Sequence, residues 1–114
     1  MEETEDILSV LSDEQSREII NLLSKTELSI QQVSTLLDIP QSTAYRKIRK
    51  LEGLKIIKKT KVVRTLEGLD ESYYKNWTSE IVVTFKDGKI SYNLEHVSME
   101  DKIVRLWQKF SEQV

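Results

Sequence analysis

The sequence predicts one small α+β domain, mostly helical, that is organised around a helix-turn-helix. Residues 29–51 contain two short amphipathic patterns that are separated by a helix-breaking proline segment. The second of these patterns opens a block of positive charge, and Asp87-Gly88 further on is a β-hairpin signal between two strand-like segments. The chain has 114 residues, of which 39% are hydrophobic, and this supports a single modest core.

The first helix of the motif is expected to begin after Ser29. The Ser29 hydroxyl can accept from a backbone N–H three residues on, and Gln32 can reach back to the Ser29 N–H, which together form a capping box. Its apolar face is formed by Ile30, Val33, Leu36 and Leu37. Pro40 ends this helix because it has no N–H to donate and because it disfavours helical geometry at the preceding residue.

The second helix, residues 41–52, is the expected recognition helix. Ala44, Ile48 and Leu51 form a narrow apolar stripe, and the small Ala44 permits a close helix crossing. The side chains that face away from this stripe are donors and cations, namely Ser42, Thr43, Tyr45, Arg46, Arg49 and Lys50. Tyr45 lies at the border and can equally be a partly buried packing residue.

The segment IQQVSTLLDIPQSTAYRKIRKLEGLKIIKK resembles the DNA-binding core of ArsR/MarR-like winged-helix transcriptional regulators. In that family a Ser-Thr pair opens the recognition helix, and a Leu-Glu-x-x-x-Ile-Ile tail leads into a β-hairpin wing. The resemblance implies a winged helix-turn-helix that binds double-stranded DNA, with a C-terminal dimerisation helix. Winged helices also include protein-interaction modules without specific DNA binding, and this alternative stays open.

Charge is segregated along the chain although the net charge is only −2. Residues 1–40 hold nine acids against two bases, residues 41–66 hold nine bases against Glu52, and residues 67–114 hold nine acids against six bases. Such a basic block is typical of a surface that contacts phosphates, whereas an ordinary solvated face mixes both signs. The predicted DNA-binding residues are Gln41, Ser42, Thr43, Tyr45, Arg46, Arg49, Lys50, Lys58, Lys59, Lys61 and Arg64.

Two helices are expected before the motif. Ile7, Leu8, Val10 and Leu11 indicate the first, and Ser12 is the expected cap of the second, which ends near Lys25. Residues 26–28 are the expected place of a minimal strand. After the recognition helix, Gly53 is the expected residue with positive φ at the helix end.

The wing has two possible assignments. In the preferred one, the basic strand 56–66 pairs with residues 78–86 around a loop at residues 67–76, and residues 89–95 add a third strand. The stretch from residue 67 to residue 77, with its aromatic residues Tyr73, Tyr74 and Trp77, is expected to be a loop or a short turn of helix. In the other assignment the wing tip is at residues 86–89.

A last helix is expected over residues 98–114, and residues 1–97 form the predicted DNA-binding domain. The helix has a wide apolar face, which can pack on a second subunit or fold back on its own domain. The predicted dimerisation residues are Ile103, Leu106, Trp107 and Phe110.

The residue types argue against several other classes of protein. One histidine, no cysteine and no glycine-rich phosphate loop argue against an enzyme and against a thiolate metal site, and no cofactor is expected. His96 with Glu100 or Asp101 is a weak metal-site candidate, and a surface role for His96 is the simpler interpretation. Without an apolar span or a basic leader, we expect a cytoplasmic protein with no membrane association. The nature of any effector is not predicted.

Overall fold

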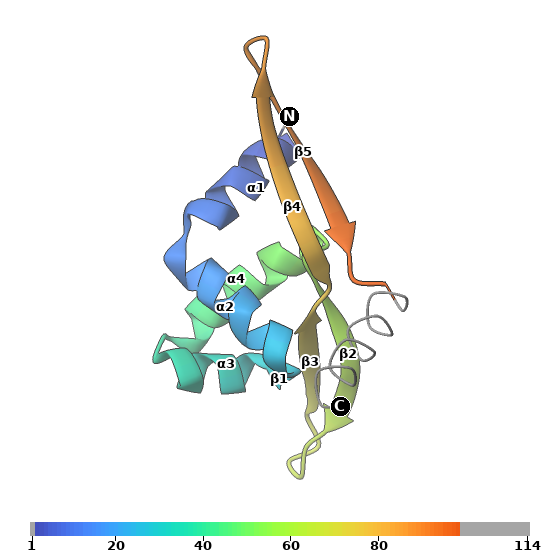
Figure 1. Cartoon of the computed structure of the whole chain (residues 1–114). Coiled ribbons are helices and arrows are strands. Elements are labelled where there is room, and N and C mark those ends of the chain that lie inside the picture. Colours follow the sequence, from blue (N-terminus) through green and yellow to red (C-terminus); the bar gives the residue numbers. More distant parts are fainter. Residues whose placement is uncertain (1, 99–114) are drawn as a thin grey trace, which may run out of the picture.

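The computed structural model describes residues 2–98, and these form four helices and five strands (Figure 1). The helices are α1 (Glu2–Ser12), α2 (Glu14–Lys25), α3 (Ile30–Leu37) and α4 (Gln41–Gly53). The strands are β1 (Leu28–Ser29), β2 (Ile57–Arg64), β3 (Asp70–Asn76), β4 (Thr78–Lys86) and β5 (Lys89–His96). The predicted C-terminal helix and its dimerisation residues lie outside the described residues.

The core lies between the four helices and the inner ends of β2 and β3. Its fully buried side chains include Ile7, Ile19, Leu23, Val33, Ala44, Ile48, Leu51, Ile56 and Ile57. Burial of each large aliphatic side chain contributes about 1.5–3 kcal/mol before the cost of ordering the chain. The apolar stripe of α4 is therefore confirmed, and it holds the opposite face of this helix toward solvent.

The helix-turn-helix is confirmed with its predicted cap. The Gln32 N–H donates to Ser29 Oγ over 3.2 Å, and the Ser29 N–H donates to Gln32 Oε1 over 2.9 Å. Asp38 ends α3 with a φ of 53°, a left-handed conformation that aspartate tolerates better than most residues. Pro40 directly precedes α4.

Two predicted helix ends are wrong by a few residues. The cap of α2 is Asp13 rather than Ser12, since the Asp13 carboxylate accepts from the Ser16 N–H and Ser12 still belongs to α1. After α4 the left-handed residue is Lys55, with a φ of 64°, whereas Gly53 is still helical. The left-handed residue therefore lies two residues beyond the glycine, and Leu54, which is buried, anchors the connection to the core.

The preferred wing assignment is also wrong. Strand β2 pairs antiparallel with β3, and the tip is a short turn at residues 65–69. Tyr74, expected in a loop, is a β3 core residue that is only 2% exposed, and it pairs with Leu28 of β1. The three-stranded sheet has the order β1-β3-β2, so the expected minimal strand is present, at Leu28–Ser29. Strand β3 has few apolar residues because only its inner end reaches the core.

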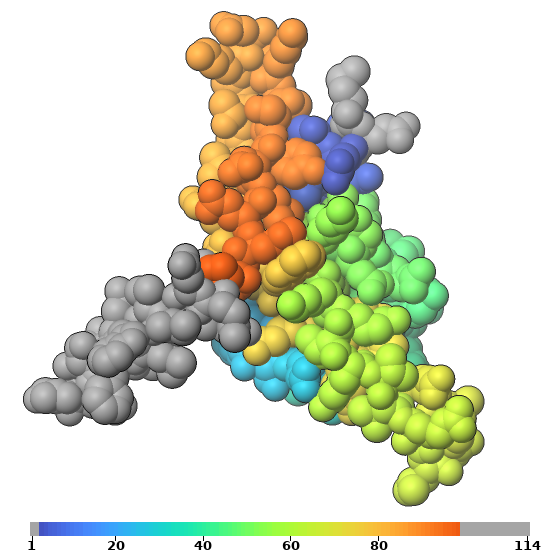
Figure 2. Space-filling view, turned by 90° about the vertical axis from the view of Figure 1, so that its right-hand side faces the viewer, coloured from blue at the N-terminus to red at the C-terminus, as the bar shows by residue number. Residues whose placement is uncertain are grey.

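Strands β4 and β5 form a separate two-stranded sheet, joined by the predicted Asp87-Gly88 turn. Both turn residues have positive φ, 55° and 73°, as this tight hairpin requires. The hairpin packs on α1 near Tyr92, whose pKa is raised by desolvation and by a hydrogen bond with Glu3. The wing and this second hairpin project from the helical body in different directions (Figure 2).

Candidate nucleic-acid interface

Helix α4 presents an exposed polar face that starts at its N-terminus. Gln41, Ser42, Arg46, Arg49 and Lys50 are all exposed. No side chain caps the helix start, so the N–H groups of the first turn and the positive end of the helix dipole face solvent. This geometry favours a bound phosphate beside the first turn.

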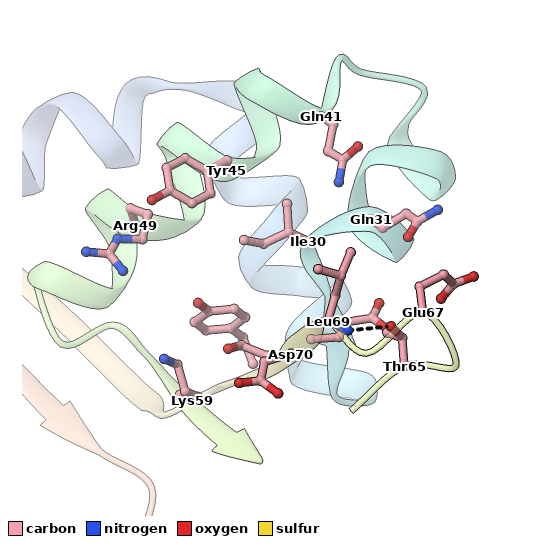
Figure 3. A pocket seen from close by; sticks show the side chains of 13 residues that line it. Ile30, Gln31, Gln41, Tyr45, Arg49, Lys59, Thr65, Glu67, Leu69 and Asp70 are labelled. Carbon is pink, nitrogen blue, oxygen red and sulfur yellow. Dashed lines mark hydrogen bonds between the residues drawn. The ribbon is translucent and has the colours of Figure 1, made fainter. Parts of the chain in front are cut away.

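A groove of about 590 Å³ separates α4 from the wing (Figure 3). Gln41, Tyr45 and Arg49 line it from α4, and Lys59 lines it from β2. Tyr45 is 53% exposed, so its side chain is not a packing residue, and the Arg49 guanidinium carbon lies 5.9 Å from the centre of its ring. The structure thus brings together four of the predicted residues, two of which are cations.

The same groove contains residues that the sequence reasoning missed. Gln31 and Ile30 line it from the start of α3, and the carboxylates of Glu67, Asp70 and Glu71 line it from the wing. Arg64, a predicted contact, is paired with Asp70 at 3.5 Å near the wing tip. The acids of the tip therefore offset part of the positive charge in the groove.

A second hollow, of about 550 Å³, lies on the other side of α4 against α1 and α2. Arg46, Lys47 and Lys50 line it from α4, and Ser9, Ser12 and Asp13 are among the residues opposite. Two of these cations have acidic partners, since Lys47 pairs with Asp13 and Lys50 lies 3.6 Å from Asp6. Arg46 has no ion pair within residues 2–98.

Asp13 is the electrostatic centre of this hollow. The hydrogen bond from Lys47, followed by that from the Ser16 hydroxyl, lowers the pKa of the Asp13 carboxyl to about 2. The side chain of Lys47 is only 14% exposed. Lys47 therefore connects α4 to α2 rather than facing a solvent-side ligand.

The predicted basic strand is divided between two faces. Lys59 faces the groove together with Tyr74, its partner in the register, whereas Lys61 pairs with Tyr73 across the bulge at Thr60 and so faces the other way. Lys61 lies 3.0 Å from Glu27 and 4.8 Å from the centre of the Tyr73 ring. The Thr60 hydroxyl and Lys61 lower the pKa of Glu27, and Glu27 in turn raises the pKa of Lys61.

Lys58 also lies outside the groove between α4 and the wing. Its ammonium is 5.3 Å from the centre of the Trp77 ring, and both residues line a smaller hollow of about 360 Å³ with Lys75. The structure therefore divides the predicted residues among the groove, the hollow beside Asp13 and the outer face of the wing. Arg46 and Lys50 line the hollow beside Asp13, whereas Ser42 is exposed in the first turn of α4.

The His96 side chain packs against other residues of the chain. Its ring stacks on Trp77 at a centroid distance of 3.5 Å, and its Nε2 lies 2.9 Å from the Lys55 carbonyl oxygen. Within residues 2–98 no group of three or more potential metal-binding side chains is assembled. Glu100 and Asp101, the other members of the weak metal-site candidate, lie outside the described residues.

Comparison with known proteins finds similarity over the helical part of the chain. Residues 7–59, which span α1 to the start of β2, match the family model of bacterial regulatory proteins of the arsR family. No match is found among curated protein sequences. No helix within residues 2–98 is both long and apolar enough to cross a membrane.

Several solved structures share the fold at low identity. HlyU from Vibrio cholerae N16961 is similar with a TM-score of 0.53 and 14% identity, over 95% of this chain and 90% of that one. NolR from Sinorhizobium fredii is similar with a TM-score of 0.54 and 15% identity, over 97% and 83% of the two chains. A fragment of a possible transcriptional regulatory protein from Mycobacterium bovis is similar with a TM-score of 0.52 and 17% identity, over 66% of this chain and 74% of that one.

Proposed function

We propose that the protein is an ArsR/MarR-like transcriptional regulator that binds double-stranded DNA as a homodimer, and the premise is the match of residues 7–59 to the family model of arsR-type bacterial regulatory proteins. The family match over residues 7–59 and the fold both support a DNA-binding regulator.

The observation that carries the proposal is the exposed, uncapped and cationic face of α4. A helix of this kind fits the major groove, which is about 12 Å wide and bounded by two phosphate backbones. The groove on one side of α4 and the hollow on the other side then offer a place for each backbone. Donors on both flanks would fix the helix in register.

The positions of six of the predicted contacts suggest a role for each. Arg46 lies on the exposed face without an acidic partner within residues 2–98, and its guanidinium can bridge the O6 and N7 atoms of a guanine. Arg49 and Lys59 line the groove and would contact one backbone. Gln41, Ser42 and Thr43 lie in the first turn, where N–H groups bind phosphate and the Gln41 amide can reach a base edge.

The homodimer is proposed from the sequence of residues 98–114. Ile103, Leu106, Trp107 and Phe110 recur at helical spacing and would pack against the same residues of a second copy. A two-fold dimer reads an inverted repeat whose half-sites are about 34 Å apart, one turn of the double helix.

A second candidate function is a winged helix that binds another protein. It is favoured by one observation, the pairing of four cations of the basic block, Lys47, Lys50, Lys61 and Arg64, with acids of the same chain. Such pairing reduces the positive electrostatic potential that would attract the phosphates of a DNA backbone.

Selection of bound duplexes from a random-sequence library distinguishes the two candidates. For the regulator, we expect enrichment of an inverted repeat with half-sites one helical turn apart. Recovery of unenriched sequence at all protein concentrations would contradict sequence-specific binding and leave the protein-interaction module as the function.

A further inference from the structure

We propose that the β4–β5 hairpin is a self-association surface, through which two copies of this chain pair edge to edge along β4. The pairing is antiparallel and has its two-fold axis at Val83. It does not depend on DNA or on residues 98–114, so it goes beyond the regulatory function proposed above.

Within residues 2–98 no strand pairs with the outer edge of β4. The β4–β5 sheet has only two strands there, and α1 lies against β5 (Figure 2). An unpaired strand edge exposes a row of N–H and C=O groups that can pair with another chain. Two of the exposed side chains of β4 are apolar, with Phe85 74% and Val82 44% exposed.

The charges of the hairpin are arranged unfavourably in a single copy. Glu80 of β4 lies directly opposite Glu95 of β5, and at the other end Lys86 lies directly opposite Lys89. Like charges in directly opposed positions destabilise a strand pair. One copy therefore has an acidic pair at the base of the hairpin and a basic pair at its tip.

Antiparallel pairing of two copies relieves both repulsions at once. It places the acidic base of each hairpin beside the basic tip of the other, so Glu80 lies opposite Lys86 of the second copy. The same register places Ile81 opposite Phe85 of the second copy and Val83 opposite itself. This self-complementary pattern of charges makes a second copy of the chain the fitting partner.

The backbone geometry agrees with this register. Residues along an antiparallel strand direct their N–H and C=O groups alternately toward and away from the neighbouring strand. Lys86 and Lys89 close the two-residue turn as a hydrogen-bonded pair. The backbone N–H and C=O groups of Ile81, Val83 and Phe85 therefore point away from β5. These are the three residues that the register pairs with one another.

The side chains on the face shared with α1 extend beyond the helix. Ile81, Val83, Tyr92 and Leu94 are partly buried against the core, whereas the next cross-strand pair, Phe85 and Ile90, is exposed at 74% and 41%. Cross-strand aromatic and branched pairs stabilise a sheet. Pairing along β4 would supply Phe85 with Ile81 of the second copy as such a neighbour.

A charge-swap experiment on the full chain tests this arrangement. The Glu80→Lys variant faces Lys86 of its second copy and the Lys86→Glu variant faces Glu80, so each should self-associate about tenfold more weakly than the wild type in sedimentation equilibrium. An equimolar mixture of the two variants should recover wild-type association, because both interchain pairs become attractive again. Within one copy each substitution replaces a like-charge pair with an opposite-charge pair, so unfolding of the hairpin would not explain the loss.

Glu95→Lys and Lys89→Glu are the matched controls. They remove the same like-charge repulsions within one copy and change the net charge by the same amount. Because they lie on β5, away from the proposed contact, they should leave association near the wild-type value. Equal association of Glu80→Lys and the wild type, or a mixture that associates no more tightly than its components, would overturn the proposal. That outcome would not count against the proposed DNA-binding function, because DNA binding is measured in a separate assay.

A cysteine variant tests the two-fold axis directly. The chain has no cysteine, so Val83→Cys introduces a unique thiol that would lie opposite itself across the axis. Oxidation should convert this variant to a disulfide-linked dimer, and Ser91→Cys on β5 should stay monomeric on a non-reducing gel. Equal cross-linking of the two variants would contradict pairing along β4.

Discussion

Lys47, in the middle of α4, donates a hydrogen bond to the carboxylate of Asp13, the residue that caps α2. The pair links α4 to α2. A cation in the centre of the basic block is thus used to position α4, whereas Arg46 and Arg49 are exposed.

Asp13→Asn should lower the free energy of unfolding by about 1 kcal/mol at pH 7. The asparagine can still cap α2, but it loses the charge that Lys47 and Ser16 stabilise, and the 37% exposure of Asp13 reduces the effect below that of a buried pair. Urea denaturation measures the difference. Glu18→Gln, an exposed carboxylate on the same helix, is the control and should leave the stability near the wild-type value.

The same pair sets a pH dependence. The pKa of Asp13 is lowered from 3.8 to about 2, so the contribution of its ionised form is complete above pH 3.8 and is lost as the pH falls through 2. The difference between the wild type and Asp13→Asn should therefore decrease between pH 3.8 and pH 2 and vanish below pH 2. A difference that is the same at pH 7 and pH 2 would mean that the charge of Asp13 has no part in stability.

Arg46→Ala should cost about 1–3 kcal/mol of binding free energy for the preferred duplex and relax selectivity at one base pair in each half-site. Lys50→Ala should weaken binding to every duplex alike, because an ammonium beside Asp6 contacts at most a phosphate. Competition assays with the preferred and a scrambled duplex measure both. Equal losses of Arg46→Ala on the two duplexes would make Arg46 a phosphate contact.

Lys59→Glu should weaken DNA binding more than Lys61→Glu. Lys59 lines the groove beside α4, whereas Lys61 lies on the other face of the wing and pairs with Glu27. The two substitutions make the same charge change two residues apart, so each is the control for the other. The opposite order of dissociation constants would place the DNA on the outer face of the wing.

Local signals predicted the helical part of the fold well. The capping box at Ser29, the break at Pro40 and the stripe of Ala44, Ile48 and Leu51 depend on residues close in sequence, and each is present in the structure. The Asp87-Gly88 hairpin is equally local. Such features depend on turn chemistry and periodicity, which a single sequence displays directly.

Strand pairing was not predictable in the same way. Residues 70–76 contain acids, serine and asparagine, and they lack the alternation of a half-buried strand because most of β3 projects from the core. The burial of Tyr74 in the core holds β3 in place between β1 and β2. The division of Lys58, Lys59 and Lys61 between two faces depends on the bulge at Thr60, and no signal in the sequence indicates that bulge.

Lys55→Gly should raise the free energy of unfolding by about 0.5–1 kcal/mol. Lys55 holds a φ of 64°, a left-handed conformation that costs a residue with a Cβ atom and that glycine adopts freely. Gly53→Ala should stabilise by a similar amount, because Gly53 is helical and a Cβ there meets no atom within 4 Å. Thermal denaturation of both variants checks the assignment, and destabilisation by Lys55→Gly would contradict the left-handed conformation.

The salt dependence of duplex binding tests the central claim, that α4 and the surfaces beside it bind the backbone of double-stranded DNA. Fluorescence anisotropy with a labelled duplex gives the association constant at a series of salt concentrations. We expect its logarithm to fall linearly with the logarithm of salt concentration, because contacts with phosphates release counterions, and we expect a shallower slope for Arg49→Ala. A slope of zero for the wild type, or no binding at low salt, would contradict the account.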